Sequence, residues 1–184
     1  MIKKYFFSIV VLLVFGKVQS QNYVVNAIPY QNITLATGLT AVSFNNDDTY
    51  SGMINLPFTV KFYGNQYNYV NISSNGYLDF STVMPSAFSP WSYSITIPNT
   101  AFPVKNALLG CYHDIDNSIN NPSAPQSVVY SIQGHYPFRK FVLLYNNNPQ
   151  FSCGITAVSS FGMVIYENTE VFDVQIKQRQ TCYG

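Results

Sequence analysis

Apolar and polar residues alternate with a period of two in several separate segments of this 184-residue chain. The alternation is clearest at residues 58–63 and 172–177, and Phe161, Met163 and Ile165 line one face of another segment. A period of two places successive side chains on opposite sides of a β-strand, and the 3.6-residue period of an amphipathic helix does not recur. The pattern predicts antiparallel sheets with one apolar face and one wetter face.

Turn residues separate these segments. Asn75 and Gly76 lie between two strand-like runs and are a strong hairpin signal, because both residues tolerate a positive φ. Further turns are expected at residues 63–66, 133–137 and 167–170. The sequence therefore predicts an all-β fold, an antiparallel β-sandwich of roughly ten strands. The expected strands are residues 23–28, 39–44, 53–63, 69–73, 77–81, 105–113, 128–132, 138–145, 160–167 and 171–177.

Two stretches do not look like strands. Residues 84–103 hold four prolines, which remove the donors that a sheet needs, and residues 116–126 are polar. Both are predicted to be surface loops that a rigid scaffold presents for recognition. The expected core is the apolar set Phe58, Val60, Phe62, Ile72, Leu78, Phe80, Leu109, Val142, Leu144, Met163, Ile165, Val174 and Ile176.

Residues 1–20 have the features of a secretory signal peptide. Two lysines open the segment, an apolar run follows at residues 5–15, and Val18 and Ser20 are small residues at the positions that a signal peptidase reads. Cleavage before Gln21 would leave no membrane span, because no later apolar run approaches the ~20 residues that a spanning helix needs. The expected location is secreted or on the cell surface.

The composition of the chain limits the classes of partner that it is expected to bind. Charged residues make up only 9% of the chain and aromatic residues 16%, which favours strands over helices. Removal of the signal peptide takes away three of the nine basic residues, so six face eight acidic ones and the formal net charge is −2. No basic patch is visible, and neither nucleic acid nor an anionic membrane surface is an expected partner.

Three cysteines remain in the exported part, and an oxidising compartment allows one disulfide. The pair Cys153 and Cys182 is favoured, because it would join the loop before one expected strand to the end of the next. Cys111 is then left over, and we expect it to be a buried, inert thiol.

Two carboxylate pairs are candidate Ca²⁺ ligands. Asp114 and Asp116 would share one side of a strand end, and Asp47 and Asp48 precede another strand. The pattern is not an EF-hand, and the alternative is that both pairs cap backbone N–H groups in turns. A single site would require the two pairs to meet in space, so no cofactor is predicted beyond this candidate calcium ion.

Three aromatic residues in the proline-rich loop, Phe88, Trp91 and Tyr93, are candidate binding residues. Exposed aromatic rings can stack on a sugar or anchor a protein partner. The alternative is that they cover one open end of the hydrophobic core.

Catalytic patterns are missing from the sequence. There is no G-x-S-x-G motif, the histidines His113 and His135 have no patterned nucleophile near them, and no zinc-ligand spacing is present. We therefore predict that the chain is not an enzyme.

Several short motifs carry a resemblance to a known family. They are residues 56–58 (LPF), 62–64 (FYG) and 73–76 (SSNG), followed by residues 107–116 and 136–142. Over residues 23–184 the chain resembles the nidogen-like (NIDO-type) β-rich module. It is most similar to the version at the N-terminus of modular surface proteins that the type IX secretion system of Bacteroidota exports. The resemblance implies a non-catalytic, extracellular module that further modules of the same protein follow.

These observations predict a signal peptide at residues 1–20 and a single module at residues 21–184, as the N-terminal fragment of a longer protein. The expected function is a cell-surface recognition or structural module of an adhesin-like protein, with an unknown protein or glycan as its ligand. Two alternatives remain: a carbohydrate-binding accessory module of a secreted enzyme, and a secreted hydrolase.

Overall fold

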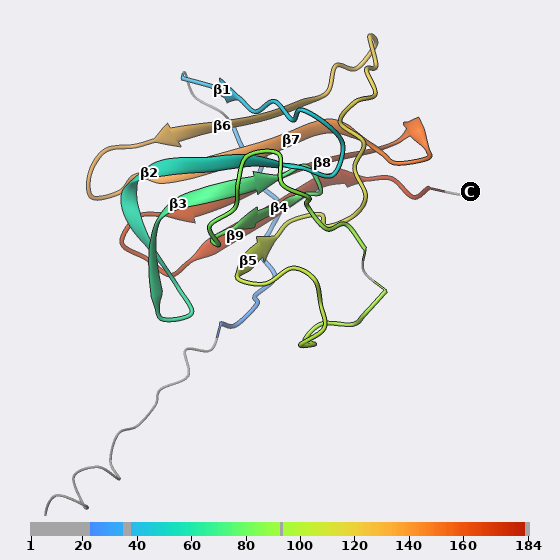
Figure 1. Ribbon diagram of the computed structural model, residues 1–184. Coiled ribbons are helices and arrows are strands. Elements are labelled where there is room, and N and C mark those ends of the chain that lie inside the picture. Colours follow the sequence, from blue (N-terminus) through green and yellow to red (C-terminus); the bar gives the residue numbers. More distant parts are fainter. Residues whose placement is uncertain (1–22, 35–37, 93, 183–184) are drawn as a thin grey trace, which may run out of the picture.

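The computed structural model describes residues 23–34, 38–92 and 94–182 (Figure 1). The expected signal peptide and the candidate binding residue Tyr93 lie outside these residues. The described chain contains nine strands and no helix. The strands are β1 (Thr40–Ala41), β2 (Tyr50–Phe62), β3 (Asn65–Ser73), β4 (Tyr77–Asp79), β5 (Ala107–Leu109), β6 (Ser127–Gln133), β7 (Lys140–Gln150), β8 (Gly154–Tyr166) and β9 (Phe172–Arg179).

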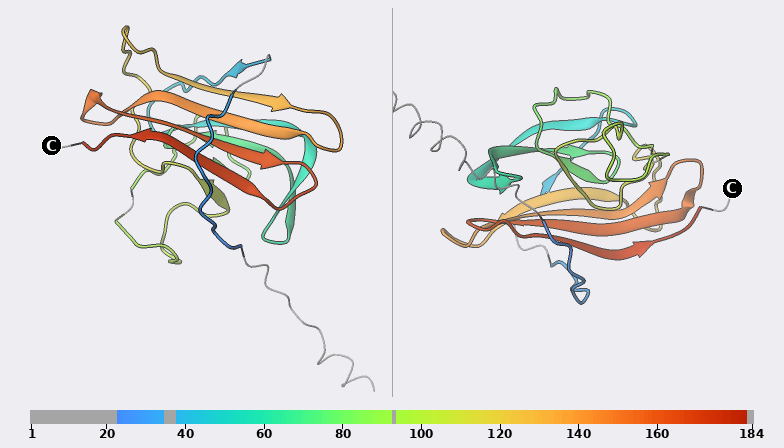
Figure 2. Two further views of the ribbon diagram at one scale, coloured as in Figure 1. Left: turned by 180° about the vertical axis from the view of Figure 1, so that it is seen from behind. Right: turned by 90° about the horizontal axis from the view of Figure 1, so that it is seen from below.

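The strands form two antiparallel sheets that face each other (Figure 1; Figure 2, right). One sheet has the order β1-β6-β7-β8-β9 and the other has the order β2-β3-β4-β5. The predicted all-β sandwich is thus confirmed, with nine strands in the described chain in place of roughly ten. Residues 23–28 do not form the expected strand, and the strand expected at 39–44 is reduced to the two residues of β1.

The predicted hairpin at Asn75 and Gly76 is confirmed, since this turn joins β3 to β4. Gly76 has φ +82°, and a Cβ atom there would collide with the backbone carbonyl of Cys111. Only glycine satisfies both the positive φ and the close approach of the neighbouring chain.

The main core lies between the sheets, where the inward residues of both layers meet. Alternate residues of β2 (Phe58, Val60 and Phe62) lie in one buried cluster with the inward residues of β8, as the period of two predicts. Tyr145 of β7 stacks on Phe161 of β8 with ring centroids 4.5 Å apart, and its hydroxyl group donates to the Ser73 carbonyl oxygen. This last bond satisfies the polar end of a fully buried tyrosine and ties the two sheets together.

Four residues of the expected core are placed differently. Phe141, Leu143 and Tyr145 of β7 face the other sheet, so Val142 and Leu144 of the same strand lie on the outer face. Leu109 is half-buried in a separate cluster on the outer face of the four-stranded sheet. Ile176 is 51% exposed because β9 is the edge strand of its sheet.

The outer face of the five-stranded sheet is covered by residues 23–34, which cross it as an extended strap (Figure 2, left). The Gln31 backbone N–H donates to the Gln175 side-chain oxygen across 3.0 Å. Ile33 occupies space that a side chain at position 162 would fill, so glycine at that position lets the strap lie close to β8. The expectation of sheets covered on one face only is therefore wrong for this sheet.

The outer face of the four-stranded sheet is covered by the long connection between β4 and β5, residues 80–106. Phe102 and Val104 of this connection pack on Tyr50 and Tyr77 in a second apolar cluster. The two tyrosine hydroxyl groups lie 2.7 Å apart, and that of Tyr50 also donates to the Asp79 carboxylate. Residues 84–103 were expected to form a surface loop, and part of this loop instead packs on the outer face of the sheet.

The predicted disulfide is confirmed. Cys153, in the turn between β7 and β8, is bonded to Cys182 beyond the end of β9, with their Cα atoms 5.8 Å apart. Cys111 is buried and unpaired in the described part of the chain, and burial raises the pKa of its thiol to about 11, which keeps it protonated and inert. Within the same residues, no helix is long and apolar enough to cross a membrane.

Candidate functional site

Three carboxylates from distant parts of the chain meet at the end of the sandwich where β2 begins. Asp47 and Asp48 lie in the loop before β2, and Asp114 follows β5. One carboxylate oxygen of each residue lies within 4.8 Å of the corresponding oxygens of the other two, and each residue is half-buried. The two carboxylate pairs of the sequence therefore do approach each other, and Asp114 is the member of the second pair that joins Asp47 and Asp48.

Asn75, in the β3–β4 turn, links the segments that carry these carboxylates by hydrogen bonds. It is completely buried; its side-chain N–H₂ donates to the Asp48 carboxylate across 2.8 Å and to the Ser89 carbonyl oxygen across 3.1 Å. Its side-chain oxygen accepts the backbone N–H of Ile115, the residue after Asp114. One buried amide thus connects the three segments that meet at the cluster, and the sequence marked it only as a turn residue.

Partial burial and mutual repulsion raise the pKa of two carboxylates in this cluster. Burial raises the pKa of Asp114 to about 6, with the Asp48, Asp47 and Asp116 carboxylates adding to the effect. Burial and the same kind of repulsion from Asp48 and Asp116 also raise the pKa of Asp47. The inner oxygen of Asp114 (Oδ1) is buried and has no hydrogen-bond partner among the described residues. Carboxylate oxygens gathered in this way match the ligands that hard divalent cations prefer.

Asp116 stands apart from the other three carboxylates. Its Oδ1 atom accepts hydrogen bonds from the backbone N–H and the hydroxyl group of Ser118, at 2.9 and 2.5 Å. These bonds form a turn within the chain, which is the alternative that the sequence left open for this residue. Its charge still acts on the cluster through space.

The aromatic loop lies next to the carboxylates. The Ser89 backbone N–H donates to the Asp48 carbonyl oxygen across 2.7 Å, and Phe88 forms an isolated β-bridge with Thr49. Phe88 is 68% exposed and Trp91 is 39% exposed. Phe88 therefore presents a largely exposed ring beside the cluster, Trp91 follows it in the same loop with a partly exposed ring, and Tyr93 is outside the described residues.

His113 is buried, beside the cluster but turned inward. One ring nitrogen is 2.7 Å from the Cys111 carbonyl oxygen and the other is 3.2 Å from the Ser159 hydroxyl group. Burial lowers the pKa of this histidine, so the ring is neutral at physiological pH. It is a satisfied core residue, because both ring nitrogens have a hydrogen-bond partner inside the fold.

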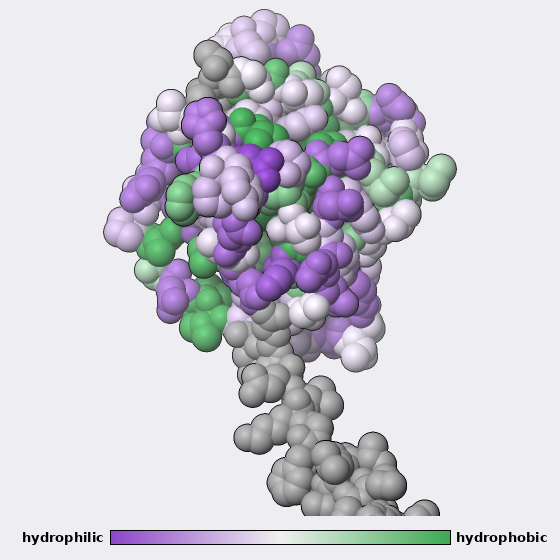
Figure 3. All heavy atoms as spheres, turned by 90° about the vertical axis from the view of Figure 1, so that its left-hand side faces the viewer, coloured by the Kyte–Doolittle hydropathy of each residue, from purple (hydrophilic) through white to green (hydrophobic). Residues whose placement is uncertain are grey.

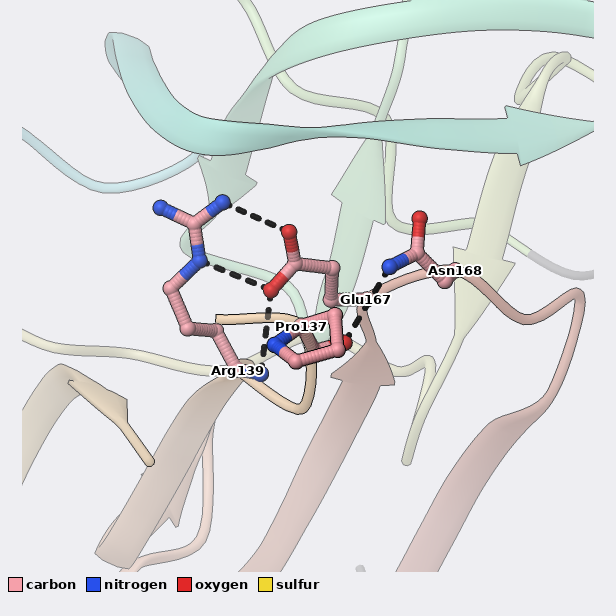
Figure 4. Close-up of polar contacts among 4 residues, drawn as sticks. All are labelled: Pro137, Arg139, Glu167 and Asn168. Atoms are coloured by element: carbon pink, nitrogen blue, oxygen red, sulfur yellow. Dashed lines mark hydrogen bonds and ion pairs between the residues drawn. The ribbon is translucent and has the colours of Figure 1, made fainter. Parts of the chain in front are cut away.

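The opposite end of the sandwich contains polar contacts that sequence reasoning missed. The Arg139 guanidinium group makes a two-point contact with the Glu167 carboxylate, at 2.7 Å from Nε and 2.6 Å from Nη2 (Figure 4). The Arg139 backbone N–H donates to the same carboxylate, and the Asn168 side chain donates to the Pro137 carbonyl oxygen across 3.1 Å. These bonds join the β6–β7 turn to the β8–β9 turn. No local sequence pattern predicts these bonds, because the bonded residues are 28 and 31 positions apart.

Comparison with protein families gives one match. A family model described as "NIDO related" matches residues 22–183, which is nearly the whole chain. Comparisons with curated proteins and with solved structures each found no match. The family match agrees with the motifs that carry the resemblance and with the observed all-β fold. This chain belongs to the NIDO-related family.

Proposed function

We propose that this chain is the recognition module of an adhesin-like protein that acts at the cell surface. The family match over residues 22–183 carries the proposal, because the nidogen-like module is an extracellular, non-enzymatic domain type. The disulfide between Cys153 and Cys182 supports an oxidising location. Export through the signal peptide at residues 1–20 and the type IX secretion context of the Bacteroidota belong to this proposal.

The architecture suits a display role. Other segments lie over both outer sheet faces, the strap on one and the β4–β5 connection on the other, and they brace the scaffold. Loops held by such a scaffold are the usual carriers of recognition. Phe88 and Trp91 are the proposed contact residues for a protein partner, because they combine exposure with an anchored backbone.

The test of this function uses the full gene in the organism that encodes it. Intact cells are treated with protease, and the exported protein is recovered and analysed by mass spectrometry. The proposal expects a chain that begins at Gln21 and is digested on intact cells, together with weaker adhesion when the gene is deleted. A protein that keeps residues 1–20 and stays protected inside the cell would contradict it.

The contact residues are tested on the same cells. The double substitution Phe88→Ser with Trp91→Ser should weaken adhesion. Because Trp91 is only 39% exposed, the melting temperature of the variant is measured as well, to confirm that it stays folded. Met84→Ser is a suitable control, since this residue of the same loop is 73% exposed and is not proposed to bind. Equal adhesion by the double variant and the wild-type cells would remove these residues from the proposal.

We also propose that Asp47, Asp48 and Asp114 hold a structural Ca²⁺ ion. The buried and unpartnered Oδ1 atom of Asp114 supports this, because a cation would supply its missing partner and offset the repulsion among the three charges. Three carboxylates provide only some of the six to eight oxygen ligands that Ca²⁺ takes, and water would complete the shell at this half-open position.

Thermal unfolding with and without a chelator tests the ion. If the affinity is that of other extracellular modules, with Kd near 10⁻⁴ M, millimolar calcium should stabilise the protein by about 1–2 kcal/mol. Magnesium at the same concentration controls for ionic strength and for general charge screening. An unchanged midpoint on addition of calcium would contradict a structural site.

A further inference from the structure

A polar groove lies at the other end of β2 from the acidic cluster. It is lined by Thr59, Lys61 and Gln66 of the β2–β3 hairpin on one side, and by residues 168–170 of the β8–β9 turn on the other. Its volume is about 510 Å³. Because β2 has 13 residues and a strand rises ~3.3 Å per residue, up to ~40 Å of strand separates the groove from the carboxylates.

The hairpin wall of the groove is ordered by sheet register. Lys61 pairs directly with Gln66, so these two side chains lie on the same face of the sheet. Thr59 lies two positions before Lys61 on β2 and shares that face, while Phe58, Val60 and Phe62 turn into the core. The polar side of an amphipathic strand thus becomes one wall of the groove.

The other wall is held by the contacts between the two neighbouring turns (Figure 4). Glu167, which immediately precedes the groove residues, is fixed by Arg139, and Asn168 is fixed by the Pro137 carbonyl oxygen. The Arg139 guanidinium group in turn lies over the ring of Phe58, 5.7 Å from its centroid. The β8–β9 turn is therefore positioned in advance of any ligand, which lowers the entropy cost of binding.

The chemistry of the lining selects a class of ligand. Two hydroxyl groups, two amides, one cation and one anion face the groove, and among the described residues Lys61 and Glu170 form no ion pair. The groove therefore offers both donors and acceptors at zero net charge, and no apolar side chain of the described residues lines it. A polyanion would find no net attraction here, and an apolar peptide or a lipid would find no matching surface.

Exposed aromatic rings stand on the turns at this end of the sandwich. Tyr63 follows the hairpin wall two positions after Lys61 and is 57% exposed. Tyr136 and Phe138 are more exposed still, and they stand on either side of Pro137, the residue that accepts the bond from Asn168. In Figure 3, which shows the end of the molecule where these turns lie, hydrophobic residues stand in small groups among hydrophilic ones. Flat apolar rings beside hydrogen-bonding groups are complementary to a sugar, which has both apolar C–H faces and hydroxyl groups.

We propose that this groove binds a neutral oligosaccharide. Thr59, Gln66, Asn168 and Thr169 would hydrogen-bond to sugar hydroxyl groups. Lys61 would donate to hydroxyl oxygens, Glu170 would accept hydrogen bonds from hydroxyl groups, and Tyr63 would stack on a sugar ring. The inference deepens the proposed function, on which it rests, by naming a ligand class and a surface separate from Phe88 and Trp91.

The test is a titration of the ¹⁵N-labelled mature protein with maltose, cellobiose and lactose, followed by amide chemical shifts. At least one disaccharide should bind with a Kd of about 1 mM or tighter, since so small a ligand buries little surface. The shifted amides should group at residues 59–66 and 167–170. Lys61→Ala combined with Glu170→Ala should weaken binding by about fivefold or more, which corresponds to the loss of one hydrogen bond.

Lys177→Ala is the matched control, because it also removes an exposed lysine from an edge strand but lies outside the groove. It should leave the disaccharide Kd unchanged. Tetraglycine serves as a second probe, and stronger binding of this peptide than of all three sugars would overturn the proposal. Shifts that fall elsewhere, or no shifts with any of the disaccharides, would overturn it as well.

The outcomes separate this inference from the proposed function. If cells need the protein for adhesion but none of the three disaccharides binds, the proposed sugar site is wrong and the proposed function stands. If a disaccharide binds but the protein never reaches the cell surface, the proposed surface function is wrong and the proposed sugar site stands.

Discussion

The two ends of β2 handle charge in opposite ways. Where the strand begins, Asp47, Asp48 and Asp114 bring three like charges together, and their oxygens depend on a neutral amide and on solvent. Where the strand ends, Arg139 and Glu167 bring opposite charges together and satisfy each other at 2.6 Å. The first end holds uncompensated like charges, whereas the charges of the second end compensate each other.

This difference shows what each end is suited to do. A cluster of like charges can gain stability from a cation, so the stability of this end should depend on the calcium concentration. The ion pair of Arg139 and Glu167 needs no further partner, so its role is to hold the two neighbouring turns in place. A preformed ligand groove needs such fixed walls. We therefore expect the acidic end to respond to ions and the groove end to respond to its own mutations and to pH.

The largest effect should come from the disulfide, which closes the chain beyond β9 onto the β7–β8 turn. Replacing both cysteines, Cys153→Ser and Cys182→Ser, should lower the free energy of unfolding by about 3–4 kcal/mol, because the bond closes a 29-residue separation. Urea denaturation gives the value. Reduction of the wild-type protein should reproduce it, and a loss below about 1 kcal/mol would mean that packing alone holds this region.

Asn75→Ala should have the next largest effect and would break the acidic end specifically. The substitution leaves Asp48, the Ser89 carbonyl oxygen and the Ile115 N–H without their buried partner, at a cost of about 3 kcal/mol. The same measurement on Asn65→Ala should show a change of about 0.5 kcal/mol or less, because that residue is exposed. Similar losses for both variants would show that Asn75 is not the centre of this arrangement.

Glu167→Gln would break the groove end, with a smaller loss than at Asn75 because Arg139 is partly exposed to solvent. The hydrogen bonds from Arg139 lower the pKa of Glu167 below its usual 4.5. The carboxylate therefore contributes stability that is full above that value and is lost as the pH falls through the lower pKa of the folded state.

The difference in unfolding free energy between wild type and Glu167→Gln should accordingly be constant near neutral pH and shrink on acidification. Glu170→Gln provides the control, since this exposed residue has no ion pair in the described chain. A difference that grows as the pH falls would contradict the assigned role of the pair.

The smallest effect should be a gain of stability from Asp114→Asn in the presence of a chelator. Removal of one of three clustered, half-buried charges should stabilise the protein by about 1 kcal/mol, with solvent screening keeping the gain small. The variant should also lose any stabilisation by calcium. Asp116→Asn should retain it, because the Asp116 carboxylate is engaged with Ser118.

Local patterns predicted the parts of the fold that depend on neighbours in sequence. The alternation at residues 58–62 gave the correct inward set, and Asn75 and Gly76 gave the correct hairpin. The same alternation failed at Ile176, because the period says which side a residue faces and not whether a second layer covers it. Residues 23–28 of the strap were expected to be a strand, because an extended segment has the same sequence pattern whether it pairs with a sheet or crosses it.

The candidate sites depended on contacts that no local pattern records. Asp47 and Asp114 lie 67 positions apart, and only the meeting of two loops at one end of the sandwich makes them neighbours. Arg139 and Glu167 are joined because β7 and β8 pair in antiparallel register, which brings Lys140 opposite Tyr166 and the residues just beyond them together. The groove is likewise a product of two sheets, with one wall from each.

By itself, the sequence determined an all-β chain, the hairpin at residues 75 and 76, the inward faces of β2 and β8 and the pair of cysteines that bond. These features follow from side-chain alternation, backbone preferences and the placement of thiols along the chain. The tertiary structure alone decided which outer faces are sealed, which carboxylates share space and where a groove opens. The physical reason is that strand order and sheet packing set the distances between remote segments, and the energies of charge and hydrogen bonding depend on those distances.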